Sequence, residues 1–194
     1  MNFVRRDKKR ILDEYLVASA QTGDRKAFSL LAKRWHPALF RHAWRLTGDE
    51  DQARDTLQDA WIDIIRGLPR LNDAAAFPAW SYQIVTRKCA SSIRKNQQVR
   101  KIKAAILAEP VRYEDGEAIA EMSADKSVVS TAIAGLPSEQ SSAMALYHLE
   151  DLSVAEISVA LGVPVGTVKT RLMHARRKIR IALNLTDTGG SNEQ

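Results

Sequence analysis

Two stretches of this 194-residue chain concentrate positive charge and contain no acidic residue, segments 87–103 and 169–180. Lys and Arg side chains gathered in this way can neutralise the phosphates of a nucleic acid, with an affinity that falls as salt rises. Two acidic stretches, 49–63 and 109–125, alternate with them along the chain. The whole chain has 29 Lys and Arg against 23 Asp and Glu, a formal net charge of +6. The clustering, more than this modest total, therefore indicates a polyanionic partner.

The second basic stretch belongs to segment 152–180, LSVAEISVALGVPVGTVKTRLMHARRKIR. Ser153 stands three residues before Glu156, the spacing of a capping box that begins a helix. Gly162 ends this helix in a tight turn, and a second helix follows Pro164. Two short helices joined by a turn with glycine are typical of a helix-turn-helix. The apolar side chains of the second helix that we expect to face inward are Val168, Leu172, Ala175 and Ile179.

The second helix of this motif presents a basic outer face with hydroxyls near its start. Such a helix suits the major groove of DNA, where its side chains can reach base edges and phosphates. The alternative is an ordinary helical hairpin with a solvated basic face. The residues predicted to meet DNA are Thr167, Lys169, Thr170, Arg171, His174, Arg176, Arg177 and Lys178. Upstream, Ser138 is the expected N-cap of a supporting helix.

Apolar residues recur at three- and four-residue steps along the whole chain, which predicts an all-α protein. The fold expected is two small helical domains, 1–98 and 127–184, joined by a polar linker, 99–126, and followed by a tail, 185–194. The helices are expected over 8–20, 24–46, 50–66, 74–96, 127–135, 138–149, 153–161 and 165–184. In the first of these, Ile11, Leu12, Tyr15 and Leu16 give an apolar face that is expected to pack on the first domain. In helix 50–66 the expected buried stripe is Leu57, Trp61, Ile64 and Ile65.

Segment 77–95 interleaves aromatic side chains with cations, a combination that suits unstacked single-stranded bases. Phe77, Trp80 and Tyr82 supply the rings, and the cations are Arg87, Lys88, Arg94 and Lys95. The alternative is that Phe77 and Trp80, three residues apart, are core residues of one helix face.

Three long segments resemble extracytoplasmic-function (ECF) sigma factors. Segment 136–183, LPSEQSSAMALYHLEDLSVAEISVALGVPVGTVKTRLMHARRKIRIAL, looks like sigma region 4. Segment 23–68, GDRKAFSLLAKRWHPALFRHAWRLTGDEDQARDTLQDAWIDIIRGL, is similar to regions 2.1 and 2.2, and FPAWSYQIVTRKCASSIRK, 77–95, to regions 2.3 and 2.4. A short linker stands where housekeeping sigma factors carry further regions.

The resemblance implies a role for each segment. Asp55, Gln58 and Asp59 would contact the clamp helices of the polymerase β′ subunit, although charge alone indicates only an acidic solvated face. Region 4 would read the promoter −35 element through the basic helix. The loop 70–76 and the helix after it would capture a flipped base of the −10 element. The −10 residues implied are Asn72, Asp73, Phe77, Trp80, Tyr82, Arg87, Lys88, Arg94 and Lys95. Arg87 stands where many members have Asn.

The function expected is that of a sigma factor, which binds core RNA polymerase, directs it to promoters and is itself no enzyme. An anti-sigma factor is an expected partner. We expect no cofactor, because there is no Gly-rich phosphate loop, and no membrane contact, because no apolar run approaches about 18 residues. We expect no metal site, because the four histidines are scattered and Cys89 is the single cysteine. That thiol is expected to be buried, with redox sensing as its alternative, and the location to be cytoplasmic. The alternative functions are a stand-alone helix-turn-helix regulator and a sigma mimic that titrates an anti-sigma factor.

Overall fold

The computed structural model describes residues 3–107 and 128–188, and every regular element within these ranges is a helix. The N-terminal half contains α1 (Phe3–Gln21), α2 (Arg25–Thr47), α3 (Glu50–Gly67), two 3₁₀ turns, η1 (Leu68–Arg70) and η2 (Ala74–Ala76), and α4 (Phe77–Leu107). The C-terminal half contains α5 (Val128–Ala134), α6 (Ser138–His148), α7 (Val154–Leu161) and α8 (Val165–Thr188). The predicted all-α fold is confirmed.

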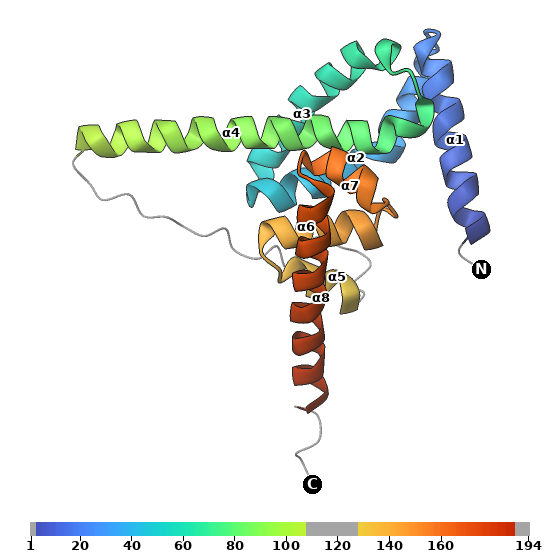
Figure 1. Ribbon diagram of the computed structural model, residues 1–194. Coiled ribbons are helices and arrows are strands. Elements are labelled where there is room, and N and C mark those ends of the chain that lie inside the picture. The colour runs from blue at the N-terminus through green and yellow to red at the C-terminus, as the bar shows by residue number, and fades with distance from the viewer. Residues whose placement is uncertain (1–2, 108–127, 189–194) are drawn as a thin grey trace.

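Helices α2, α3 and α4 pack against one another around the core of the N-terminal half (Figure 1). Local sequence fixes where they begin and end. The Asp24 carboxylate accepts hydrogen bonds from the Lys26 and Ala27 amides at the start of α2, and Gly48 ends that helix with φ of 71°. Asp49 caps α3 through the Gln52 amide. These caps satisfy amides that a helix leaves unpaired at its start.

Helix α1 packs on α2 with a different face from the one that the sequence indicated. Leu16 and Val17 are buried, and the buried Asp13 carboxylate accepts a hydrogen bond from Arg34 Nε at 2.9 Å. Ile11, Leu12 and Tyr15 are exposed. The prediction that these three side chains pack on the domain was wrong, and only Leu16 of the predicted face is buried. The buried side also contains Asp13, whose ion pair with Arg34 cannot be recognised from an apolar pattern.

The helix-turn-helix of the C-terminal half has the predicted local geometry. Ser153 accepts a hydrogen bond from the Glu156 amide, and the Glu156 carboxylate accepts one from the Ser153 amide, which completes the capping box. Gly162 adopts φ of 65°, a left-handed conformation that glycine tolerates best. The inward residues Val168, Leu172 and Ala175 of α8 are buried, and Ile179 packs against them.

Several element boundaries differ from the predictions, and those of α6 and α4 bear on the candidate sites. Ser138 is the first residue of α6 and not its N-cap, and its hydroxyl instead donates to the Arg45 carbonyl at the end of α2, at 2.8 Å. Helix α4 begins at Phe77, after η2, and continues to Leu107, past the expected end at residue 96. It therefore runs into the predicted linker and extends beyond α2 and α3 (Figure 1). Residues 108–126 of that linker lie outside the described residues, as does most of the predicted tail.

The two halves are packed against each other. Helix α7 lies along α4, and α6 contacts α2. The turn between α6 and α7 also contacts α1, because Arg10 donates a hydrogen bond to the Asp151 carbonyl. Polar contacts cross this boundary, among them an ion pair of 3.2 Å between Arg41 and Glu150.

Candidate DNA- and polymerase-binding surfaces

The outward face of α8 is centred on Thr170, His174 and Arg177. These side chains stand opposite the buried Val168, Leu172 and Ala175, because successive helical residues are about 100° apart. All three residues are exposed. Their positions span about 10 Å along the axis at 1.5 Å per residue. A helix face of this kind can lie in the major groove and reach bases and phosphates together.

The other predicted residues of α8 flank this centre. Lys169, Arg176 and Lys178 are exposed, and Thr167 is half-buried. Arg176 lies over the Tyr147 ring, 5.2 Å from its centroid. Arg171 is ion-paired with Glu139 at 2.8 Å and its side chain is mostly buried. The expectation of a freely outward Arg171 is therefore corrected: this guanidinium also ties α8 to α6.

Met173 was missed by sequence reasoning. Its side chain is exposed on the same face as Thr170 and Arg177. The helical spacing could have found it, since position 173 is three residues from Thr170 and four from Arg177, the spacings that share a helix face. An apolar side chain here can contact a thymine methyl group in the major groove.

Helix α3 displays the predicted acidic face. Asp55, Gln58 and Asp59 are exposed and lie within one turn of one another. Arg54, the cation beside them, is held by Glu50 at 2.7 Å and by Asp51 at 3.0 Å. Because Arg54 is neutralised by the first turn of its own helix, the carboxylates of Asp55 and Asp59 remain available to an external cation.

The acidic face of α3 continues into an apolar surface that the sequence reasoning did not predict. Ile65 is 52% exposed, so its expected place in the buried stripe was wrong, and Ile62 is 43% exposed. Trp61 is half-buried, whereas Leu57 and Ile64 are fully buried as predicted. Ile65 and Trp61 also border an open hollow of about 300 Å³ between α2 and α3.

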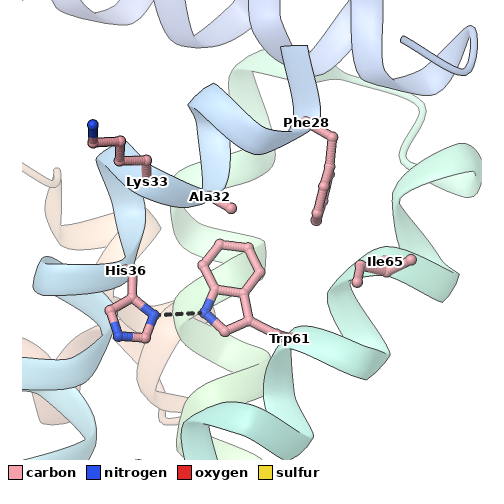
Figure 2. A pocket seen from close by; sticks show the side chains of 6 residues that line it. All are labelled: Phe28, Ala32, Lys33, His36, Trp61 and Ile65. Atoms are coloured by element: carbon pink, nitrogen blue, oxygen red, sulfur yellow. Dashed lines mark hydrogen bonds between the residues drawn. The ribbon is translucent and has the colours of Figure 1, made fainter. Parts of the chain in front are cut away.

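Figure 2 shows how the side chains around this hollow are arranged. The Trp61 indole Nε1 donates to His36 Nδ1 at 3.2 Å, and Phe28 meets the Trp61 ring edge to face. Ala32 and Lys33 complete the α2 side. The hydrogen bond fixes the indole, so the hollow has a defined apolar wall beside the carboxylates of α3.

The aromatic side chains of segment 77–95 are chiefly core residues. Phe77 is fully buried against Trp35, with ring centroids 5.4 Å apart, so stacking on a base is not available to it. Trp80 is half-buried and packs on Gly67. Tyr82 is fully buried between α2 and the C-terminal half, near the Glu150 carboxylate. The core alternative is thus correct for Phe77. Because both rings are fully buried, the base-stacking predictions for Phe77 and Tyr82 are withdrawn.

The polar residues of this region divide between two faces. Asn72 and Asp73 are exposed in the loop before α4, and the Asp73 carboxylate caps η2 through the Ala75 amide at 2.9 Å. Arg87 and Arg94, seven residues apart on α4, share one exposed face, and Lys95 is exposed beside them. Lys88 instead turns to α3, where it pairs with Asp63 at 2.8 Å. The predicted contact of Lys88 with DNA stays a prediction, and it would compete with this ion pair.

Two buried titratable groups lie behind this surface. His42 donates to or accepts from the Thr86 hydroxyl at 2.9 Å, and burial, with the nearby Arg45 charge, lowers the pKa of His42 to about 3. Cys89 is fully buried, as predicted, and burial raises the pKa of its thiol to about 12. His42 is therefore neutral, and Cys89 is an unreactive thiol, at physiological pH.

Neither a metal cluster nor a membrane helix is found in the part of the chain that the structure describes. Within residues 3–107 and 128–188, no three His, Cys, Asp or Glu side chains gather as metal ligands. None of the helices in these ranges is long and apolar enough to cross a membrane.

Comparison with known proteins assigns both halves. Residues 31–99 match the model of sigma-70 region 2, and residues 127–179 match that of sigma-70 region 4. The chain is 32% identical to the ECF RNA polymerase sigma factor SigM of Mycobacterium tuberculosis over 91% of its length and 87% of that protein's. It is 28% identical to the ECF sigma-E factor of Escherichia coli K12, over 88% of this chain and 94% of that one.

Among solved structures, the fold is similar to that of sigma factor RpoE in complex with the anti-sigma factor NepR from Bartonella quintana. The TM-score is 0.62 at 23% identity, over 82% of this chain and 98% of that one. CnrH in complex with the cytosolic domain of CnrY gives a TM-score of 0.59 at 22% identity, over 90% and 98% of the two chains. These likenesses establish a shared fold.

The two matched domains define a two-domain sigma factor of the sigma-70 superfamily. Because the chain is 32% identical to SigM over 91% of its own length, it belongs to the ECF sigma factors.

Proposed function

We propose that this ECF sigma factor binds core RNA polymerase through α3 and directs it to promoters by reading −10 and −35 elements with its two halves. The observation that carries the proposal is the outward face of α8, where Thr170, His174 and Arg177 are exposed above a fixed helix-turn-helix. Residues that begin such a helix contact bases, and its Lys and Arg side chains contact phosphates.

Contact with core polymerase is proposed for the exposed face of α3. Asp55 and Asp59 offer carboxylates to the basic clamp helices that sigma factors of this family bind, and Gln58 adds a hydrogen-bonding group between them. Ile62 and Ile65, exposed on the same helix, extend this surface with apolar area. Charged groups steer the encounter, and buried apolar side chains hold an interface together.

The −10 element is assigned to the loop before α4 and to the exposed face of that helix. Asn72 can donate to or accept from the edge of an extruded base, the Asp73 carboxylate can accept from it, and Arg87 and Arg94 can contact the strand backbone. Extruding a base costs a few kcal/mol, so a pocket that binds only the extruded base couples recognition to melting. Control by an anti-sigma factor is supported by RpoE and CnrH, which have this fold and were solved with NepR and CnrY.

A pull-down with core polymerase and a run-off transcription assay test the proposal together. The sigma factor is expected to associate with core enzyme and to support transcription from a promoter selected with the holoenzyme. A stand-alone regulator would bind duplex DNA without core enzyme and would leave transcription by core polymerase unchanged. A mimic would associate with an anti-sigma factor and support no transcription. Either result would overturn the proposal.

A further inference from the structure

Helix α1 exposes apolar side chains on the side that faces away from α2. Ile11 is 63% exposed, Tyr15 is 66% exposed and Leu12 is 43% exposed. Asp13, the buried residue midway between Ile11 and Tyr15, points to the opposite side, because two helical positions are about 200° apart. Exposed apolar side chains that gather on one face of a helix can mark an interaction site.

Cations precede these apolar residues along α1. The sequence has Arg5 and Lys8 at three-residue steps before Ile11, and Lys9, beside them, is exposed. Helical positions three or four apart lie on one face. The helix therefore changes from basic to apolar toward its C-terminal end.

Helix α3 has the complementary order on its exposed face. Asp55 and Asp59 are followed by Ile62 and Ile65, again at steps of three and four residues. Positions 5–15 of α1 and 55–65 of α3 cover the same length of helix, about 15 Å at 1.5 Å per residue. If α1 of one copy lies parallel to α3 of another, cations meet carboxylates and apolar residues meet apolar residues. An amphipathic helix that docks in an apolar groove uses this spacing for its anchors.

The hollow beside Ile65 can receive the Tyr15 ring. It has a volume of about 300 Å³, and Phe28 and Trp61 contribute to its lining. The Lys33 amine points away from the Trp61 ring, so the wall that faces an incoming side chain is apolar (Figure 2). A tyrosine suits such a site, because its ring packs on apolar groups while its hydroxyl stays in water.

Helix α1 cannot reach the hollow of its own chain. Its buried Asp13 is held by Arg34 of α2 at 2.9 Å. Arg34 is two positions from both Ala32 and His36, which line the hollow, so it lies about 200° around α2 from them. The two surfaces are on different sides of α2, and a contact between them requires a second copy of the chain. Every copy carries both surfaces.

We propose that this protein self-associates head to tail, with the exposed face of α1 of one copy packed on α3 of the next and Tyr15 seated in the hollow. The contact is heterologous, so each assembly has a free α1 at one end and a free α3 at the other. The copy that supplies α3 has its proposed polymerase surface covered. Core polymerase therefore competes with self-association, a consequence that rests on the proposed function.

Two docking variants disrupt the contact from its two sides. Ile11→Gln/Tyr15→Gln removes apolar area from α1, and Ile65→Lys places a cation where the basic α1 docks. Each is expected to weaken self-association about tenfold or more. The three side chains are exposed, so the fold does not depend on burying them. Val129→Gln and Val129→Lys make the same kinds of change at an exposed position of α5 and serve as controls.

Sedimentation velocity of the full-length chain over a range of concentrations measures self-association. The wild type and both Val129 variants should form species larger than dimers as the concentration rises, with less association at high salt. Each docking variant alone should stay monomeric at concentrations where the wild type associates. An equimolar mixture of the two should form dimers that grow no further, because the intact α1 of Ile65→Lys docks on the intact α3 of Ile11→Gln/Tyr15→Gln.

Three results would overturn the proposal: a wild type that stays monomeric at every concentration, association that the docking variants leave unchanged, or a mixture of these variants that stays monomeric. A monomeric wild type whose affinity for core polymerase falls in Ile11→Gln/Tyr15→Gln would show that α1 binds polymerase instead of a second copy. Sedimentation of the sigma factor alone does not depend on polymerase. A wild type that self-associates but neither binds core enzyme nor transcribes would remove the proposed function alone.

Discussion

The two halves of this protein place their candidate sites in different ways. In the C-terminal half, one helix, α8, carries the whole proposed DNA surface, and its buried face, Val168, Leu172 and Ala175, faces directly away from it. In the N-terminal half, the candidate residues lie on α3, on the loop before α4 and on α4 itself. Moving one helix of that half therefore changes the relative positions of several candidate groups. A site on a single helix depends on the placement of that helix alone, and a distributed site depends on the relative placement of several elements.

The largest expected effect comes from breaking the packing of α8. Leu172→Ala removes a buried side chain and is expected to destabilise the C-terminal half by about 2–5 kcal/mol. All four tryptophans lie in the N-terminal half, so their fluorescence reports that half, whereas circular dichroism reports helices of both. In the Leu172→Ala variant the dichroism transition should begin at a lower urea concentration than in the wild type, while the fluorescence transition should change little.

The neighbouring Met173 provides the matched control for Leu172. Its side chain is exposed, and Met173→Ala is expected to change stability by no more than about 0.5 kcal/mol. If Leu172→Ala shifted both optical transitions by the same amount, the two halves would unfold as one unit and the comparison would fail.

A smaller effect is expected from a glycine in the N-terminal half. A Cβ added at Gly67 would stand 2.7 Å from Trp80 Cζ2, closer than two carbon atoms approach, and the indole ring cannot bend away. Gly67→Ala is expected to cost about 1–3 kcal/mol and to displace the start of α4. The loss of stability is measured by thermal unfolding, with tryptophan fluorescence as the signal.

Gly135 offers the corresponding control in the other half. An added Cβ there meets only carbonyl oxygens at 3.9 Å and 4.0 Å, which is ordinary contact. Gly135→Ala should leave stability nearly unchanged or raise it slightly, because alanine restricts the unfolded chain. Equal losses from the two substitutions would show that steric contact with Trp80 is not the cause.

The smallest expected effect concerns Glu156, which caps α7 and also contacts α1. Burial acts to raise the pKa of this carboxyl, but the hydrogen bonds from Ser153 and the charge of Arg10 together lower it below its ordinary value of 4.5. Because the folded pKa lies below the unfolded one, the stabilisation is complete above about pH 4.5 and is lost as the pH falls through the folded pKa. Glu156→Gln should therefore be less stable than the wild type near neutral pH.

Urea unfolding of the wild type and Glu156→Gln at a series of pH values measures this effect. The difference in stability should shrink as the pH is lowered below about 4.5. A difference that stayed constant across this range would mean that the charge of Glu156 contributes nothing.

The sequence predicted the C-terminal half better than the N-terminal half, for physical reasons. The capping box, the turn glycine and the apolar stripe of α8 are local patterns, so they can be recognised without knowing what packs on them. The faces of α1 and of residues 77–88 depend on distant partners. Asp13 meets Arg34, Phe77 meets Trp35, and Lys88 meets Asp63.

The candidate polymerase surface was predicted in part. The acidic residues of α3 are exposed as expected, but the exposure of Ile65 and the hollow beside Trp61 were not foreseen. Apolar periodicity identifies which residues can be buried, and it cannot tell which edge of a broad stripe the neighbouring helix leaves uncovered. The contacts between the halves have no local sequence signal at all, since they join residues far apart in the chain, such as Arg45 and Ser138, which are 93 positions apart.

The central claim is that α3 serves polymerase binding and α8 serves promoter recognition, and paired affinity measurements test it most directly. Fluorescence anisotropy gives the affinity of the sigma factor for core enzyme, and then that of the preformed holoenzyme for promoter DNA. Asp55→Ala/Asp59→Ala is expected to weaken core binding about tenfold or more and to leave promoter affinity unchanged at saturating sigma factor. Arg177→Ala is expected to leave core binding unchanged and to weaken promoter binding by about 1–3 kcal/mol. Loss of core affinity in the Arg177 variant, or unchanged core affinity in the α3 variant, would contradict the account.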